Sequence, residues 1–283
     1  MAFKKVGVVG CGLMGRGIAE VSAKSGYDVV VSEINRELLD KGMAAVKGSL
    51  ARAVEKGKLA QADMDKTLGK IKGTTDMMDF KDCDLVVEAA IENLELKKKI
   101  FTDLDRICAP NAVLSTNTSC LSVMDVAAVT KRTDKVLGCH FFNPVPVMKL
   151  LELVKTITTS KETLDAAVEW GKSLGKTVII APDRPGFIVN RSFMPYMIEA
   201  FEMYEQGVAS REDIDNGVQL GLNHPMGPLT LAAMVGLDTL LFVTDAIYAE
   251  TKNPKFVAPI LLRKMVTAGQ LGRKTGKGFY DYK

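Results

Sequence analysis

The chain of 283 residues is 47% hydrophobic and 25% charged, as in ordinary globular proteins, and its net charge of +3 gives no argument for a nucleic-acid or membrane partner. The five cysteines are odd in number and lack C-x-x-C spacing, so we expect reduced thiols and no metal site. No apolar run reaches about 18 residues, so we expect a cytoplasmic protein without membrane spans.

A glycine-rich turn follows the first predicted strand, Val6 to Val9. Its sequence is Gly10-Cys11-Gly12-Leu13-Met14-Gly15, and the residues after it have the apolar spacing of a helix. Gly10 permits a sharp exit from the strand, Gly12 lets the backbone approach a pyrophosphate, and Gly15 lets the helix lie close to the sheet. We interpret the segment as a dinucleotide-binding turn in which Leu13 and Met14 also border the cofactor; a purely structural glycine turn is the alternative.

A carboxylate ends the second predicted strand, Val29 to Val31. Glu33 stands where this fold places an acid against the hydroxyls of the adenosine ribose. Because a carboxylate repels a 2′-phosphate, Glu33 favours NAD over NADP. A solvated acid at a strand end is the alternative interpretation.

A long helix is predicted after Asn35, which can cap it. Its apolar stripe comprises Leu38, Met43, Val46, Leu50 and Val54. Arg52 and Lys56 stand one turn apart on its outer side, which suits a phosphate-bearing ligand. Spacing alone leaves a solvated charged face as the commoner explanation.

Strands then alternate with helices, which predicts a parallel sheet covered on both faces. The predicted elements are strands at 71–74, 84–88, 112–115 and 135–139, with a helix at 95–107. Ligands of such sheets bind beyond the carboxyl ends of the strands. The candidate site residues at that edge are Glu92, Lys97, Asn117, Ser119 and His140.

Ser119 could cap the next helix, but Ser122 is better placed because Asp125 follows it in an S-x-x-D pattern. The Ser119 hydroxyl is therefore available for a ligand.

His140 is one of two histidines, and its partner is predicted by symmetry about Pro146. If the strands on either side fold back on each other there, position 140 falls opposite Glu152. A carboxylate in the apolar strand Leu150 to Val154 needs a partner to offset its desolvation, and an imidazole is suitable. An oriented histidine is what proton abstraction requires, so the pair is a candidate acid–base site.

The second half of the chain is predicted to be helical. After a helix at 164–174 and a strand at 177–180, the segment Ala181 to Gly186 has the composition of a linker, so we expect domains at 1–183 and 184–283. The predicted helices cover 187–201, 211–220, 229–235, 238–250 and 257–268. Their methionine-rich and leucine-rich faces predict a homodimer or larger homo-oligomer formed through this domain.

Two polar features of this half stand out. Asn190 interrupts the apolar stripe that runs from Phe187 to Phe201. It is interpreted as a satisfied core amide, as a residue that sets the register of a helix interface, or as a residue that binds a ligand. The glycine-rich basic tail around Lys274 either folds back toward phosphates or is a solvated end.

Several motifs together resemble one family. The glycine turn, Thr116-Asn117-Thr118-Ser119, His140-Phe141-Phe142-Asn143-Pro144, Pro185-Gly186-Phe187-Ile188-Val189-Asn190-Arg191 and the tail around Lys274 are similar, in the same order, to those of the L-3-hydroxyacyl-CoA dehydrogenases. The likeness is strongest to the bacterial members that act on 3-hydroxybutyryl-CoA, and it covers essentially the whole chain. Glu33 departs from the aspartate that is common there, and Cys120 from a second serine.

The resemblance implies reversible hydride transfer between NAD and the C3 hydroxyl of a 3-hydroxyacyl-CoA. It assigns His140 as general base and Glu152 as its orienting partner, with Ser119 and Asn190 bound to the reacting oxygen or the thioester carbonyl. It also implies that Arg52 and Lys56 meet CoA phosphates. The remaining implied cofactor-binding residues are Glu92, Lys97, Asn117, Asn143 and Lys274.

Two other functions remain open from the sequence. One is a related dehydrogenase that acts on a free sugar acid or hydroxy acid, against which the pair Arg52 and Lys56 argues. The other is a non-catalytic NAD-binding protein, against which the set Ser119, His140, Glu152 and Asn190 argues.

Overall fold

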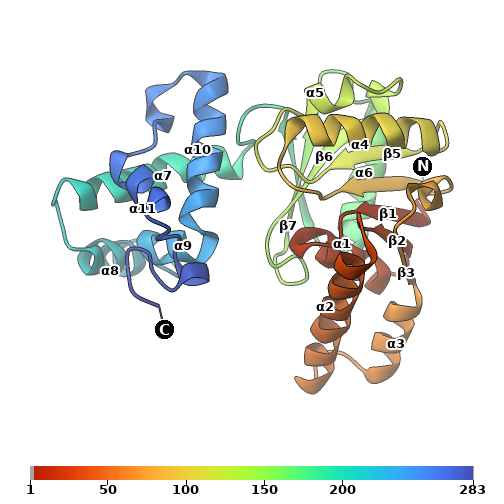
Figure 1. Cartoon of the computed structure of the whole chain (residues 1–283), viewed down its shortest axis with the longest axis horizontal. Coiled ribbons are helices and arrows are strands. Elements are labelled where there is room, and N and C mark those ends of the chain that lie inside the picture. The colour runs from red at the N-terminus through yellow and green to blue at the C-terminus, as the bar shows by residue number, and fades with distance from the viewer. Residues whose placement is uncertain (1–2, 283) are drawn as a thin grey trace. The chain divides into compact units, whose positions relative to one another are not determined.

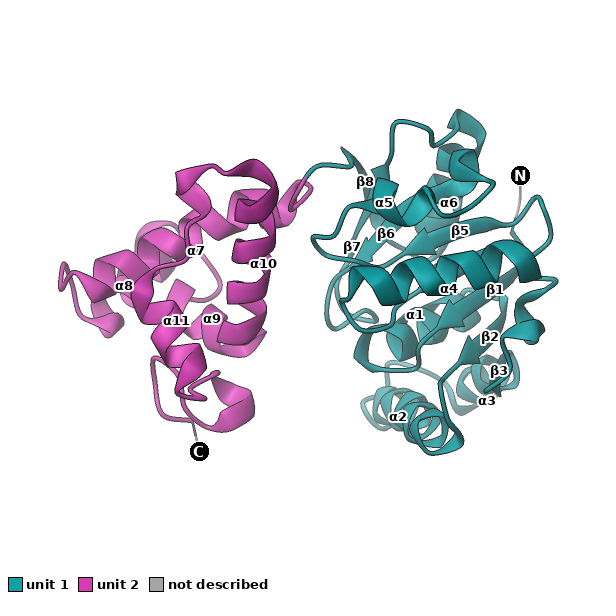
Figure 2. Cartoon of the chain, turned by 45° about the horizontal axis from the view of Figure 1, so that its top comes forward, with its two compact units in different colours: residues 1–184 teal, residues 185–283 magenta. Residues whose placement is uncertain are grey.

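The structure, a computed structural model, describes residues 3–282 and divides into two compact units with the boundary between Arg184 and Pro185. Figure 2 colours unit 1 and unit 2 separately. The boundary lies one residue beyond the one drawn from the sequence. The outer ends of the two predicted domains, residues 1–2 and 283, lie outside the described part.

Unit 1 is built on an eight-stranded sheet with the order β3-β2-β1-β4-β5-β6-β7-β8. All neighbours are parallel except β6 and β7, which run antiparallel, so the predicted mainly parallel, Rossmann-type sheet is confirmed. The strands are β1 (Lys5–Val9), β2 (Asp28–Ser32), β3 (Ile71–Thr74), β4 (Leu85–Glu88), β5 (Val113–Thr116), β6 (Val136–Phe141), β7 (Leu150–Lys155) and β8 (Thr177–Pro182).

Helices cover both faces of this sheet, as Figure 1 allows the reader to follow. Val6 and Val8 of β1 belong to a core that residues of α1, α2 and α6 share. Gly7 faces the opposite side, where an added Cβ would lie 2.7 Å from the ring of Phe80. The helical segments of unit 1 are α1 (Leu13–Lys24), α2 (Arg36–Glu55), α3 (Gln61–Gly69), η1 (Met77–Phe80), α4 (Leu94–Ile107), α5 (Val123–Ala127), η2 (Thr133–Lys135) and α6 (Lys161–Ser173).

Local sequence signals start these helices. The Asn35 side chain accepts from the Leu38 amide at 2.9 Å, and the Ser122 hydroxyl accepts from the Asp125 amide at 3.1 Å, so both predicted caps are confirmed. The predicted stripe of α2 is wrong by one residue at its start, because Leu39 is 1% exposed and Leu38 is 40% exposed. The helical phase that buries Val46 and Leu50 also brings position 39, rather than 38, toward the sheet.

Three further differences from the sequence expectations have physical reasons. Helix α3 was not predicted, since its nine residues bury only Met64 and Thr67 and carry little apolar periodicity. Helix α6 begins at Lys161 because the Ser160 hydroxyl accepts from the Thr163 amide at 3.2 Å. Strand β8 continues through two residues of the predicted linker, since Ala181 and Pro182 pair with the end of β7.

Unit 2 is helical, as predicted. Its elements are α7 (Val189–Glu205), α8 (Arg211–Gly221), α9 (Pro228–Val235), α10 (Leu237–Thr251), η3 (Pro254–Phe256), α11 (Ile260–Thr267) and η4 (Arg273–Thr275). Helix α11 starts three residues later than predicted, after Pro259 at its N-cap. The C-terminal tail closes this unit: Phe279 stacks on Phe201 with 5.2 Å between ring centroids, and the Tyr280 hydroxyl donates to Asp215 at 3.0 Å.

Within residues 3–282, no individual helix has both the length and the apolar character needed to cross a membrane. The bent pair α9 and α10 passes the length and composition criteria only when its two helices are taken together.

Candidate active site

The turn between β1 and α1 offers open space at an uncapped helix end. A Cβ added to Gly15 would lie 1.8 Å from the carbonyl oxygen of Gly10, whereas one added to Gly12 would meet nothing within 4 Å. Gly10 has φ +92°, which favours glycine. No side chain caps α1, so its first amide groups are available to an anion. These features fit a dinucleotide's pyrophosphate in front of Gly12.

Glu33 lies beside this turn. Its Oε1 accepts from the Cys11 amide at 2.9 Å and its Oε2 from the Ile34 amide at 3.0 Å. Two backbone donors therefore fix the carboxylate between the glycine turn and the end of β2. Each carboxylate oxygen can accept a further hydrogen bond, which leaves capacity for a ribose diol.

A buried charge cluster occupies the ends of β4 and β5. Lys97 of α4 is 1% exposed and donates to both carboxylate oxygens of Glu88, at 2.8 and 2.9 Å. Its ammonium also lies 3.2 Å from Glu92 Oε2. The Thr116 hydroxyl donates to Glu88 Oε2 at 2.7 Å, so two strand ends and a helix share one ion-paired group.

Glu92 connects this cluster to the loop after β5. Its Oε1 accepts from the Thr118 hydroxyl at 2.5 Å and from the Ser119 amide at 2.8 Å. The Asn117 side chain, in the same loop, accepts from the Phe141 amide at 2.9 Å. The loop that carries Ser119 is therefore tied on one side to Glu92 and on the other to the end of β6, next to His140.

His140 and Glu152 form the predicted pair. They are direct partners in the antiparallel β6–β7 register, and His140 Nδ1 lies 2.7 Å from Glu152 Oε2. Glu152 is 0% exposed and His140 is 6% exposed. With Nδ1 held by the carboxylate, proton exchange with a ligand has to pass through Nε2. The pairing predicted from the symmetry about Pro146 is confirmed.

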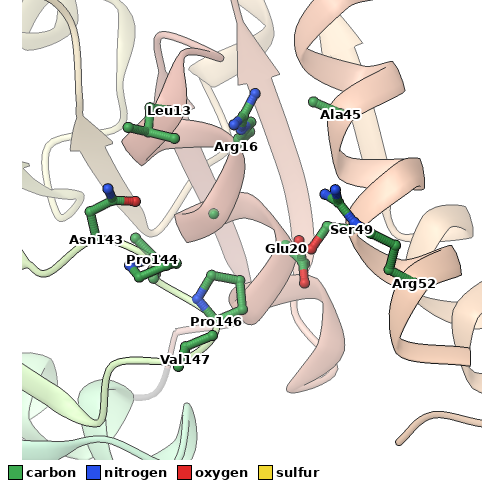
Figure 3. A pocket seen from close by; sticks show the side chains of 12 residues that line it. Leu13, Arg16, Glu20, Ala45, Ser49, Arg52, Asn143, Pro144, Pro146 and Val147 are labelled. Carbon is green, nitrogen blue, oxygen red and sulfur yellow. The ribbon is translucent and has the colours of Figure 1, made fainter. Parts of the chain in front are cut away.

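A cavity of about 180 Å³ lies between α1, α2 and the loop after β6. Arg16, Glu20, Ser49, Arg52 and Asn143 are among its lining residues, and Figure 3 shows Glu20 and Ser49 turned toward one another. Burial raises the pKa of Glu20, and this is opposed by a hydrogen bond with Ser49 and by the charges of Lys24, Arg16 and Arg52. The basic side of the cavity suits a phosphate-bearing ligand.

Of the predicted phosphate-binding pair, only Arg52 lines this cavity; Lys56 is exposed at the C-cap of α2. The remaining predicted site residues belong to unit 2. Asn190 is the second residue of α7 and is half-buried. The Lys274 ammonium donates to the two oxygens of Asp238 at 2.5 and 2.6 Å.

Four residues of these sites were missed from the sequence. Glu88 is a carboxylate that ends an otherwise apolar strand, the same signal that singled out Glu152. Arg16 and Glu20 share a face of α1 with Leu13, and Ser49 lies one turn from Arg52, so helical spacing would have found them. Within residues 3–282 no group of three or more potential metal ligands is present.

Known proteins resemble the whole chain. Residues 5–184 match the family model of the 3-hydroxyacyl-CoA dehydrogenase NAD binding domain, and residues 186–282 match that of its C-terminal domain. A 3-hydroxybutyryl-CoA dehydrogenase of Mycobacterium tuberculosis is 48% identical over 283 residues, covering 99% of each chain. One of Clostridioides difficile is 45% identical over 278 residues, 98% of this chain and 99% of the other.

A solved structure agrees with these relatives. The crystal structure of an (S)-3-hydroxybutyryl-CoA dehydrogenase from Ralstonia eutropha has 47% sequence identity and a TM-score of 0.97, with 100% of both chains covered.

Proposed function

Because the chain belongs to the 3-hydroxyacyl-CoA dehydrogenase family, an NAD-dependent oxidoreductase family, we propose that it interconverts (S)-3-hydroxybutyryl-CoA and acetoacetyl-CoA. The observation that carries this proposal is the buried His140–Glu152 pair, at 2.7 Å, in the same unit as the glycine turn. NAD, when bound, supplies the acceptor for the hydride that leaves C3. The protein's own residues must handle the proton.

His140 is the proposed general base. It takes the proton of the C3 hydroxyl through Nε2 as the alcohol is oxidised and returns it in the reverse direction. Glu152 holds Nδ1 and offsets the charge of the imidazolium that forms. Because Glu152 is fully buried, this interaction is less screened than an exposed one.

Ser119 and Asn190 are the proposed hydrogen-bond donors to the reacting oxygen or the thioester carbonyl. Donors at that position stabilise charge that develops on the oxygen during the reaction. The attachment of the Ser119 loop to Glu92 supports this role, since a fixed loop loses little entropy when substrate binds.

The proposed cofactor site follows the sheet edge. Gly10, Gly12, Leu13, Met14 and Gly15 surround the pyrophosphate, and Glu33 accepts from the ribose hydroxyls. Glu92, Asn117, Ser119, Asn143 and Lys274 border the other half of the dinucleotide, with Lys97 behind Glu92. Since Lys97 is 1% exposed, we assign it to holding Glu92 in place.

The proposed CoA site uses the cavity beside α2. Arg52 contacts a phosphate there, and Lys56 adds a more distant charge at the end of the same helix. A site that binds CoA phosphates distinguishes this activity from that of a dehydrogenase of free hydroxy acids.

One assay tests the proposed function. NADH oxidation is followed with acetoacetyl-CoA, with free acetoacetate and without substrate. We expect NADH oxidation with acetoacetyl-CoA and none with free acetoacetate or without substrate. Comparable rates with the free acid would favour the hydroxy-acid alternative, and no turnover with a folded, NADH-binding protein would favour a non-catalytic role.

The assembly is also a proposal. Unit 1 holds the nucleotide, and unit 2 carries the contact of a cytoplasmic homodimer or larger homo-oligomer. Exposed apolar side chains on described helices of unit 2 support this, among them Leu220, Met234, Phe242 and Ile260. Light scattering at micromolar concentration is expected to give at least twice the chain mass; a fully active monomer would contradict it.

A further inference from the structure

The cluster formed by Glu88, Lys97 and Glu92 has more negative than positive groups. Two carboxylates surround one ammonium, so the cluster has a net charge of −1. Glu88 and Lys97 are 0% and 1% exposed, and water therefore screens their charges little. The third member, Glu92, has a side chain that is 25% exposed, so the excess carboxylate is within reach of a ligand while the paired Glu88 and Lys97 are not.

The sheet order indicates which part of the dinucleotide this charge meets. Glu33 at the end of β2 takes the adenosine ribose in the proposed function, and the pyrophosphate lies at the turn after β1. In the order β3-β2-β1-β4-β5-β6, the next strand ends belong to β4 and β5, which carry Glu88 and Thr116. His140 at the end of β6 lies further along the same edge. The ring that exchanges hydride therefore falls between the glycine turn and His140, beside the cluster.

We propose that the net negative charge of the Glu88–Lys97–Glu92 cluster tunes the ratio of the enzyme's affinities for oxidised and reduced NAD, in favour of the oxidised form. The inference rests on the proposed function. Glu88 and Lys97 are positioning residues here: Lys97 contacts Glu92, Glu88 accepts from Thr116, and Glu92 accepts from the Ser119 loop.

The charge of the cofactor ring explains why the ratio of affinities is the informative quantity. The oxidised nicotinamide ring is a cation and the reduced ring is neutral, whereas the pyrophosphate has the same charge in both. A negative cluster therefore stabilises bound NAD⁺ relative to bound NADH. Any general loosening of the site changes both dissociation constants and leaves their ratio nearly constant.

Charge-changing variants test the proposal by binding alone. The Kd of NADH is measured from its fluorescence and the Kd of NAD⁺ by calorimetry, without substrate. Glu88→Gln removes the excess charge, and we expect it to weaken NAD⁺ relative to NADH by about 3- to 15-fold, the range for a unit charge in a partly buried setting. Lys97→Gln makes the cluster more negative and should move the ratio in the opposite direction. The double variant restores the net charge, and its ratio should return toward that of the unmodified protein.

A buried ion pair elsewhere in unit 1 supplies the control. Arg132 and Asp105 are each about 10% exposed in their side chains, and Arg132 also donates to the Ala109 carbonyl, before β5 and away from its carboxyl end. Asp105→Asn should lower the Tm and leave the affinity ratio unchanged.

The affinity ratio and the Tm together distinguish a role in cofactor preference from a purely structural role. If either single variant keeps the unmodified ratio while its Tm falls, the cluster is structural and the inference is overturned. If Glu88→Gln does not fold, Lys97→Gln decides alone by the sign of its change. Failure of the unmodified protein to bind NADH would instead contradict the proposed function.

Discussion

Two regions of unit 1 hold buried carboxylates in different ways. At the strand ends, Glu152 and Glu88 are each 0% exposed and each lies within 2.8 Å of a basic group. In the wall of the cavity, Glu20 is 7% exposed, and the two arginines that line the same cavity are accessible to water. The first arrangement fixes charge in place; the second leaves it free to reorganise around a ligand.

This difference indicates which kinetic quantity each region controls. A charge fixed beside the reacting atoms acts mainly in the transition state, so its removal lowers kcat. Solvated charges contribute mainly to binding, so their removal raises KM.

The largest effect is expected at the strand ends. Glu152→Gln keeps the shape of the side chain and removes the charge that supports imidazolium. We expect kcat to fall by about 10²-fold or more, with a much smaller change in KM for acetoacetyl-CoA. Steady-state kinetics measure both.

The control for this variant is Asp105→Asn, which breaks another buried ion pair away from the site. Its kcat should stay close to that of the unmodified protein. An unchanged kcat in Glu152→Gln would remove the catalytic importance of the pair, even though the pair exists.

The next effect concerns Glu33, whose carboxylate is fixed by two backbone amides and is proposed to accept from the adenosine ribose. We expect the unmodified protein to prefer NAD to NADP by a wide margin in kcat/KM. Glu33→Ala should narrow that margin by about tenfold, because the repulsion of a 2′-phosphate is lost.

Glu33→Gln refines this experiment. It keeps an acceptor for the Cys11 amide and removes the charge together with the acceptor for the Ile34 amide, so most of the narrowing should already occur in it. Equal kcat/KM for the two cofactors in the unmodified protein would contradict the assignment of Glu33 to the adenosine ribose.

A smaller effect is expected in the cavity. Arg52→Ala combined with Lys56→Ala should raise KM for acetoacetyl-CoA by about 5- to 10-fold and leave KM for NADH nearly unchanged. Since Arg52 lines the cavity and Lys56 does not, the single Arg52 variant should account for most of this change. Lys47→Ala, an exposed site on the same helix, is the matched control. A change confined to NADH would assign the pair to the other ligand.

The smallest effect is a dependence of stability on pH. Burial raises the pKa of Glu20, so between its unfolded and folded pKa values the folded state binds more protons than the unfolded state. Stability due to this group therefore falls as pH rises through that window. Glu20→Gln should increase the Tm slightly at pH 7.5, and the gain should shrink toward pH 4.

Thermal unfolding at several pH values measures this, with the exposed Glu55→Gln variant on α2 as control. A Tm difference that is constant with pH would show that the pKa of Glu20 is the same in the folded and unfolded states, which would contradict the prediction.

The sequence was most informative where one residue type contradicts its surroundings. Glu152 in an apolar strand, with a turn centred on Pro146, was sufficient to predict its partner. Glu88 carries the same contradiction, but its cation comes from α4, and no local symmetry indicates which residue of a helix reaches a strand end. The cavity could not be predicted, because it depends on how α1 and α2 lie against the loop after β6. Periodicity within each helix does not give that arrangement.

The antiparallel pairing of β6 with β7 also bears on the order in which the two proposed sites form during folding. His140 and Glu152 are 12 residues apart and meet by closing a short hairpin, whereas β1 reaches β4 by pairing Val6 with Leu85. Closing the longer loop costs more chain entropy before any contact is gained. We therefore expect the proton-transfer pair to assemble before the dinucleotide site, so that newly made chains acquire an oriented imidazole before they can hold the cofactor.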